Sequence, residues 1–246
     1  MAKQSGLGDN LYVAGYDLSG DIGSLGTIAG PRGVTDVTGI DKSAMERLLL
    51  GKDGNIEFTS WFNPTTGQAH DRLADLPTTD QILTYCRGTA LGSPAASMVA
   101  KQINYDGTRA ADGALSFSTS AQANGYGLDW GRLLTAGKRT DTTATSPATG
   151  VDHTDVSTLF GWQAYLHVFA VTGTSVTVTI QDSADNATFA NLTGAAFTAA
   201  TGVTSQRLEG GRTATVRRYL RVITTGTFSN AVFAVGFTRN TADVQL

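Results

Sequence analysis

The chain has 246 residues, of which 29 are glycine and only 16% are charged. This length allows one large or two modest domains, each with a buried core, and the abundance of Gly, Thr, Ser and Val favours short strands joined by tight turns. The formal net charge is −3, with 12 basic and 14 acidic side chains in residues 1–139 and 6 and 7 in residues 140–246. A large basic surface for gripping phosphates is therefore excluded.

Residues 1–10 are polar and read as an arm without a core of its own. A first strand is predicted over 11–18, followed by a glycine-broken stretch in which only 34–38 regains strand character. The spacing of apolar residues predicts a helix over 41–50, opened by a capping box and stopped by Gly51.

Strict alternation of apolar and polar residues predicts a strand over 56–62, and a long polar loop is expected over 63–77. A second helix is predicted at about 78–87, with Ile82, Leu83 and Cys86 facing inward. Strands at 98–105 and 113–120 flank an Asp-Gly turn, and the run from Asp129 to Gly137 closes the unit.

The boundary between two units is expected where apolar residues nearly vanish, so the predicted domains are 1–139, a linker at 140–156, and 157–246. The second unit shows repeated short alternating strands, typical of an antiparallel β-sandwich. They are expected at 161–171, 175–182, 197–204, 219–224 and 231–239.

Residues suited to catalysis are few. There is no Gly-x-Ser-x-Gly nucleophile elbow. Of three possible bases, His70 and His153 lie in polar loops and are predicted to be solvated, whereas His167 lies in an apolar strand as a core or rim residue. Cys86 is the sole cysteine, which excludes an intrachain disulfide and suggests a buried thiol. We therefore expect no catalytic residue and no enzyme activity.

Metal and cofactor sites are not predicted either. Asp182, Asp185 and Asn186 come closest to a calcium turn, but Asp and Asn are also common hairpin residues and the calcium-loop order is missing. The glycines at 20, 23 and 26 lack the Gly-Lys-Ser/Thr of a phosphate loop.

Two features leave binding roles open. Five arginines of the second unit could contact nucleic acid, although a solvated face or acidic neighbours explain them better; they are Arg207, Arg212, Arg217, Arg218 and Arg221. Three tryptophans could stack on sugars, although each lies in a strand-like run where core packing is commoner; they are Trp61, Trp130 and Trp162.

Several motifs in order resemble the tail tube proteins of long, non-contractile-tailed bacteriophages over about residues 8–139. They are Gly15-Tyr16-Asp17-Leu18-Ser19-Gly20, Asp36-Val37-Thr38-Gly39-Ile40-Asp41, the Asn63-Pro64 loop, Gln102-Ile103-Asn104-Tyr105, Asp112-Gly113-Ala114-Leu115-Ser116-Phe117 and Leu128-Asp129-Trp130-Gly131. The resemblance implies a β-sandwich or half-barrel with one or two short flanking helices, assembled into stacked, commonly six-membered rings around DNA. The second unit resembles the immunoglobulin-like domains that decorate such tubes.

This resemblance implies a virion tail protein made in the bacterial cytoplasm. Its partners would be copies of itself, the tape measure protein, the tail terminator and distal tail proteins, double-stranded DNA passing without readout, and host-surface glycans at the second unit. Subunit contacts are predicted in the arm and the 63–77 loop, at Gln4, Leu7, Asn10, Asn63, Gln68, His70 and Arg72.

Other functions remain open at this stage. The main alternative is a carbohydrate-binding or adhesion protein that holds glycans through Trp162 or Tyr219. A capsid decoration protein is another. The start of the chain lacks the apolar run of a signal peptide and no stretch approaches the roughly 18 to 20 apolar residues of a membrane span, so we expect no membrane insertion.

Overall fold

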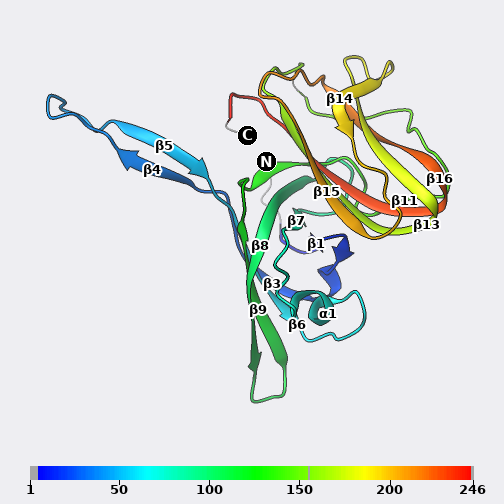
Figure 1. Ribbon diagram of the computed structural model, residues 1–246, viewed down its shortest axis with the longest axis horizontal. Coiled ribbons are helices and arrows are strands. Elements are labelled where there is room, and N and C mark those ends of the chain that lie inside the picture. Colours follow the sequence, from blue (N-terminus) through cyan, green and yellow to red (C-terminus); the bar gives the residue numbers. More distant parts are fainter. Residues whose placement is uncertain (1–4, 155, 245–246) are drawn as a thin grey trace.

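The computed structural model describes residues 5–154 and 156–244 (Figure 1). It confirms a mainly β fold: within the described residues, the helices are α1 (Ala69–Leu73) and a single 3₁₀ turn, Ser19–Asp21. One sheet system joins fourteen strands, and a separate pair, β4 (Arg32–Asp36) and β5 (Arg47–Lys52), forms a projecting hairpin. All the strand pairs are antiparallel, which suits the short turns that the composition predicts.

The N-terminal half forms two layers around one core. One layer runs β2-β1-β7-β8, and the second runs β9-β6-β3, reached through the far end of the long strand β8. The strands are β1 (Asn10–Val13), β2 (Tyr16–Asp17), β3 (Ile22–Ala29), β6 (Asn55–Trp61), β7 (Gln81–Cys86), β8 (Pro94–Arg109), β9 (Leu115–Ala123) and β10 (Asp129–Leu133).

Alternation fills this core as the sequence predicts. In β6, Ile56 and Phe58 point inward while Glu57 and Thr59 point outward. Ala69 and Leu73 of α1 are fully buried against the same cluster. The helix therefore covers the core at one end of the two layers, as Figure 1 shows.

The C-terminal half is built on two very long strands, β13 (Trp162–Ser183) and β16 (Tyr219–Arg239), which pair with each other along their whole length. Bulges between Val168 and Ser175 bend this ribbon, and Gly173 takes a φ of +131° that only glycine adopts freely. The two strands predicted at 161–171 and 175–182 are thus one bent strand. Even-numbered residues on both sides of the bend face a single core.

Shorter strands complete the C-terminal half: β11 (Arg139–Asp141), β12 (Val151–Asp152), β14 (Ala190–Ala196) and β15 (Thr204–Gly210). β11 and β12 both pair with β16, so the segment 140–156 that was predicted as a linker contributes to the sheet. The strand expected at 197–204 lies mostly outside strands, between β14 and β15. The division into two domains stays a prediction.

The two halves share backbone pairing at β10. Trp130 pairs with Ala96 of β8, and Leu133 pairs with Gly236 of β16, so the sheet runs from one half into the other. A cluster of buried side chains lies across this junction: Tyr12, Cys86, Ala95, Leu133 and Ala234. Burial of Cys86 confirms the predicted apolar thiol and raises the pKa of its side chain.

The helix predicted over 41–50 is wrong. Leu48 and Leu49 belong to β5 and pair with Thr35 and Val34 of β4. A ten-residue helix is marginal unless it docks on a sheet, whereas pairing with 32–36 satisfies the backbone directly. The apolar spacing of this segment fits both periods.

The helix predicted at 78–87 is also wrong, because residues 81–86 form β7. This strand lies between β1 and β8, and five consecutive residues from Ile82 to Cys86 are buried. A strand covered on both faces shows a continuous apolar run rather than alternation, which periodicity cannot separate from a buried helix.

Two smaller differences concern turns and loops. The strand predicted at 11–18 is broken by a tight turn at Ala14 and Gly15, both at positive φ, so that β1 and β2 form a small hairpin. A Cβ on Gly15 would lie 2.8 Å from the carbonyl oxygen of Thr204, which leaves room only for glycine. The loop predicted at 63–77 contains α1.

Candidate interaction surfaces

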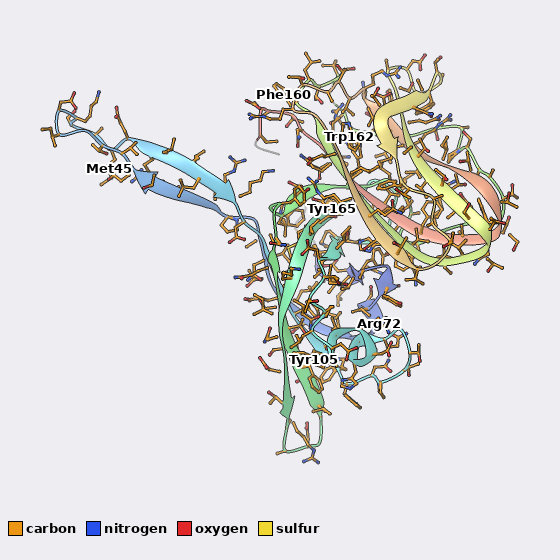
Figure 2. The ribbon with its side chains drawn as sticks, viewed as in Figure 1. Met45, Arg72, Tyr105, Phe160, Trp162 and Tyr165 are labelled. Atoms are coloured by element: carbon orange, nitrogen blue, oxygen red, sulfur yellow. The ribbon has the colours of Figure 1, made fainter. Side chains whose placement is uncertain are left out.

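The β4–β5 hairpin extends away from the body of the molecule and carries Met45 near its end (Figures 1 and 2). Its large apolar side chains are exposed, and Ile40 at the tip has no cover at all. These side chains are Val34, Val37, Ile40, Met45, Leu48, Leu49 and Leu50. A contiguous set of this kind marks a surface that another molecule covers.

The base of the hairpin is bonded to the body of the molecule, whereas the rest of the hairpin packs against no other described strand. Lys52 Nζ lies 3.2 Å from Asp129 Oδ1, and the Asp53 N–H donates to the Pro31 carbonyl at 2.9 Å. Beyond this base, the two strands pair with each other and with no other described strand. Because a lone two-stranded hairpin is marginally stable in water, contact with a second surface would stabilise it.

A second projecting hairpin is formed by the far ends of β8 and β9, with Tyr105 on its flank (Figure 2). Tyr105 and Phe117 stack with ring centroids 4.3 Å apart, and both rings lie near His70 of α1. Phe62 completes this aromatic cluster at 4.6 Å from the His70 ring. His70 therefore packs among aromatic rings and is not the solvated loop histidine that the sequence suggested.

Four predicted contact residues gather around α1. Asp21 organises this region, because its carboxylate accepts from Asn63 Nδ2 at 2.8 Å and from the Ala69 N–H at 2.9 Å. Gln68 precedes the helix, and Arg72 Nη1 donates to Tyr16 Oη at 3.1 Å.

The arm residues lie elsewhere: Leu7 is exposed, Asn10 pairs with Cys86 in the sheet, and Gln4 lies outside the described residues. The structure thus brings Asn63, Gln68, His70 and Arg72 together but does not place Leu7 or Asn10 in the α1 region. Their contact with another subunit stays a prediction.

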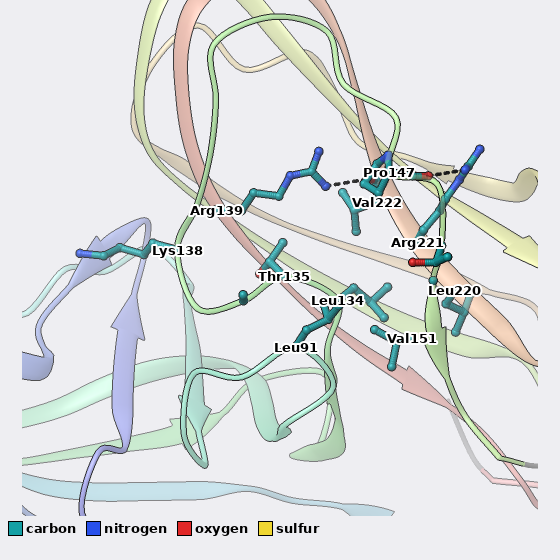
Figure 3. A pocket seen from close by; sticks show the side chains of 13 residues that line it. Leu91, Leu134, Thr135, Lys138, Arg139, Pro147, Val151, Leu220, Arg221 and Val222 are labelled. Carbon is teal, nitrogen blue, oxygen red and sulfur yellow. Dashed lines mark hydrogen bonds between the residues drawn. The ribbon is translucent and has the colours of Figure 1, made fainter. Parts of the chain in front are cut away.

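An apolar hollow of about 390 Å³ opens beside β11 (Figure 3). Its apolar lining includes Leu91, Leu134, Pro147, Val151, Leu220 and Val222. Two arginines at its border are held by backbone carbonyls: Arg139 donates to Val222 O at 2.7 Å, and Arg221 donates to Pro147 O. Arg139 also forms an ion pair with Asp141 at 2.7 Å, so the hollow is apolar inside and has Arg221 as the border guanidinium held by a carbonyl, an amide and a ring.

A buried polar network connects the two halves of the molecule. His167 accepts from the Gly15 N–H through Nδ1 at 3.2 Å, so its Nε2–H donates to Thr84 Oγ1 at 2.9 Å. Thr84 also contacts Ser97 Oγ at 2.9 Å. Desolvation lowers the pKa of His167 to about 3 and keeps the ring neutral, which confirms the predicted core position.

A second network lies nearby. Tyr165 Oη, in β13, donates to Asp129 Oδ2 of β10 at 2.8 Å, and burial is the largest cause that raises the pKa of Tyr165. Arg207 donates to Tyr165 Oη at 3.3 Å and lies 3.6 Å above the Tyr126 ring. These contacts hold Tyr165, Asp129 and Arg207 in place at the junction between the two halves.

His153 was predicted in a solvated loop, but its side chain is buried and contacts the ring of Phe237. Desolvation, followed by the charge of Arg239, lowers the pKa of His153 to about 3. Trp162 stacks on the same Phe237 and is fully buried, so it is not accessible to a glycan. Trp61 and Trp130 differ from the predicted core packing, since about half of each side chain is exposed.

The arginines of the second unit have local contacts. Four of them form ion pairs, as the sequence favoured: Arg207 with Glu209, Arg212 with Asp243, Arg217 with Asp182 and Arg218 with Asp152. Asp185 instead accepts backbone N–H groups of its own turn, which lowers its pKa. Within the described residues, no group of three or more His, Cys, Asp or Glu side chains could hold a metal ion.

The exposed surface of the β4–β5 hairpin was not predicted from the sequence. The pattern that could have indicated it is the apolar run Leu48-Leu49-Leu50 before Lys52-Asp53-Gly54, but this pattern is equally typical of a buried segment before a turn. Among the described residues, no helix has the length and apolarity needed to cross a membrane.

Comparisons with known proteins give only low similarities. No protein-family model matches the chain, and no curated protein matches it. Among solved structures, it is similar to the SPP1 Dit (gp 19.1) protein, a paradigm of hub adsorption apparatus in Gram-positive infecting phages, with 11% identity, a TM-score of 0.34, and coverage of 94% of this chain and 99% of that one.

The chain is also similar to chains of two structures of the phage p2 baseplate in its activated conformation, one with Sr and one with Ca. With Sr the identity is 9% and the TM-score 0.36; with Ca they are 9% and 0.30; in both, 94% of this chain and 98% of the other are covered. At scores this low, the similarities do not establish a shared fold.

Proposed function

We propose that the chain is a structural protein of a bacteriophage tail that assembles with copies of itself into rings, which stack into the tube through which DNA passes. The observation that carries this proposal is the β4–β5 hairpin, whose seven large apolar side chains are exposed on a projecting arm. Exposed apolar surface of this extent favours a subunit that contacts another molecule over a monomeric domain. A self-assembling subunit uses it to bury apolar surface against its neighbour.

Open strand edges support the same proposal. Among the described strands, β3 pairs only with β6, and β15 pairs only with β13. Exposed edges risk uncontrolled pairing unless partners cover them, and a contact between two different surfaces repeated around an axis closes a ring. The motif order of residues 8–139, which resembles tail tube proteins, agrees with this use.

In the proposed tail, the protein is not an enzyme and works in the virion. It contacts the tape measure protein, the terminator and the distal tail proteins, and it lets double-stranded DNA pass without sequence readout. The small net charge of −3 suits such a passage, because each neutralised phosphate would add affinity that movement must break.

Electron microscopy of the purified full chain tests the proposal. Stacked rings or tubes are expected. Discrete single rings would support a ring-forming tail protein but would replace the tube with a terminal or hub ring. Monomers at all concentrations, or glycan binding without any polymer, would contradict the proposal and favour an adhesion protein.

A further inference from the structure

We infer that the tip of the β4–β5 hairpin of one copy inserts Ile40 into the apolar hollow beside β11 of the next copy. The hairpin tip is defined here as residues 37–46. This inference rests on the proposed self-assembly and names the contact that joins neighbouring subunits. It concerns a surface pair that lies outside the arm and the 63–77 loop.

The hairpin tip presents its apolar side chains in an ordered turn. The Val37 N–H donates to the Glu46 carbonyl at 3.0 Å, and the Glu46 N–H donates to Thr38 Oγ1 at 2.9 Å. Ile40 and Met45 are both exposed on this turn, and Figure 2 shows Met45 near the end of the hairpin. These hydrogen bonds hold the tip in one turn, and binding to a second surface would stabilise the hairpin that carries it.

The hollow offers the matching chemistry. Its lining is mainly apolar, and Leu91 at its border is half exposed. Leu134, Val151 and Leu220 are buried residues of the second core, so its inner wall is rigid. An isoleucine that enters a fixed apolar hollow is the usual form of an interface anchor.

Charges at the two surfaces are complementary. Arg221 at the border contacts Gln181 Oε1 at 2.8 Å, the Pro147 carbonyl and the ring of Phe189, none of which is acidic. Next to Ile40, Asp41 is strongly exposed and has only a loose contact with Lys42, at 4.0 Å. Insertion of Ile40 therefore brings an exposed carboxylate to a guanidinium whose contacts, within the described residues, are an amide, a carbonyl and an aromatic ring.

The positions of the two surfaces fit a ring. In Figure 1 the hairpin extends to the left, whereas β11, which borders the hollow, lies at the right of the molecule. Each copy can thus donate its tip on one side and receive a tip on the other. Such a heterologous contact propagates around a ring, whereas pairing of two hairpins would close a dimer.

Cross-linking tests the contact directly. Full-length Ile40→Cys and Leu91→Cys chains, one of them carrying a mass tag, are mixed under assembly conditions and oxidised with copper phenanthroline. We expect a disulfide-linked dimer of the two different chains, and a ladder of longer species from a chain that carries both substitutions. Cys86 is buried and does not compete.

A charge exchange gives an independent test. Asp41→Arg and Arg221→Glu should each raise the protein concentration needed for assembly about tenfold, and the double variant should restore it. Asp243→Arg is the control for charge alone, because Asp243 lies in an exposed ion pair near the other end of the chain.

The inference is overturned if wild-type rings form while only Ile40→Cys homodimers appear, or if the double charge variant assembles no better than either single one. In that case the proposed function still stands on the wild-type rings. A wild-type chain that never assembles would remove the proposed function, and this contact with it.

Discussion

At the scale of single residues, buried polar groups hold the two halves of the molecule together. His167 can satisfy both ring nitrogens only as the neutral form, because Gly15 donates to one and Thr84 accepts from the other. A protonated ring would carry two donors and a charge in a fully buried site. The network therefore ties folding stability to pH.

Stability should fall as the pH drops below about 6.5, the pKa of an unfolded histidine. The pKa of His167 in the fold is about 3, so between these values the unfolded chain binds one more proton than the folded chain. The contribution of His167 to folding stability is therefore complete above the pKa of the unfolded chain. It is lost as the pH falls towards the pKa of the folded chain, by about 1.4 kcal/mol per pH unit. His153, with a pKa of about 3, adds a similar slope.

Urea unfolding at a series of pH values measures this effect. His167→Gln keeps an acceptor and a donor but cannot titrate, so the slope of unfolding free energy against pH should decrease by about one proton. An unchanged slope between about pH 4 and about pH 6 would mean that His167 is not the group that titrates.

At the scale of elements, alternation predicted the strands that have one face in a core. The strands expected at 56–62, 98–105, 113–120 and 231–239 all lie in or overlap β6, β8, β9 and β16. The two helix predictions failed for different reasons: β7 is covered on both sides and shows no alternation, and β5 pairs with the preceding strand β4 across the 37–46 turn. Local spacing contains no information about either partner.

The candidate surface was predicted only in part, for a related reason. Subunit contacts were predicted in residues 63–72 because this stretch is a polar loop, and four of its side chains do gather around α1. No contact was predicted for the apolar hairpin, because an apolar run usually indicates a core. Exposure of Ile40 and Leu49 depends on where the rest of the chain lies, which the sequence pattern does not encode.

Gly131 makes the junction of β8, β10 and β16 possible. A Cβ at this position would lie 2.2 Å from the Phe237 carbonyl oxygen, and that oxygen belongs to backbone that cannot move aside. Gly131→Ala should therefore destabilise the fold by about 2 kcal/mol or more, measured by urea unfolding. Gly20→Ala is the matched control, since a Cβ there meets nothing within 4 Å. Equal stability of the two variants would contradict the close approach.

Replacing the outer part of the β4–β5 hairpin, residues 33–51, with a short Gly-Ser turn should leave the fold intact. None of the large apolar side chains on this segment is buried, so the two cores lose nothing. We expect a thermal midpoint within a few degrees of the wild type, because surface changes usually alter stability by about 0.5 kcal/mol or less. Assembly, followed by electron microscopy, should be abolished. Normal rings from this variant would contradict the proposed role of the hairpin in assembly.

At the scale of the whole molecule, the shared sheet predicts cooperative unfolding. Strand β10 bonds to both halves, and Tyr12, Cys86 and Ala234 form one buried cluster across the junction. Loss of one half would expose this cluster and the Tyr165–Asp129 contact. Calorimetry of the unassembled chain should therefore show one transition, and two well-separated transitions would indicate independent domains.

The assembled protein should not retain duplex DNA at physiological salt. The outward face of β6 and β9 carries Glu57, Thr59, Ser118 and Ser120, hydroxyls and a carboxylate rather than cations. A wall of this composition neutralises no phosphate, so it releases no counterions and adds no affinity for DNA.

Lysines introduced on this face test its place in the channel. Thr59→Lys with Ser118→Lys should create salt-sensitive retention of short duplexes inside intact tubes. The same two lysines placed at Thr193 and Thr201, which are exposed and lie outside β6 and β9, serve as the control for charge. Retention by the wild-type assembly in a filter-binding assay, steeply weakened by added salt, would instead indicate an active DNA-holding role.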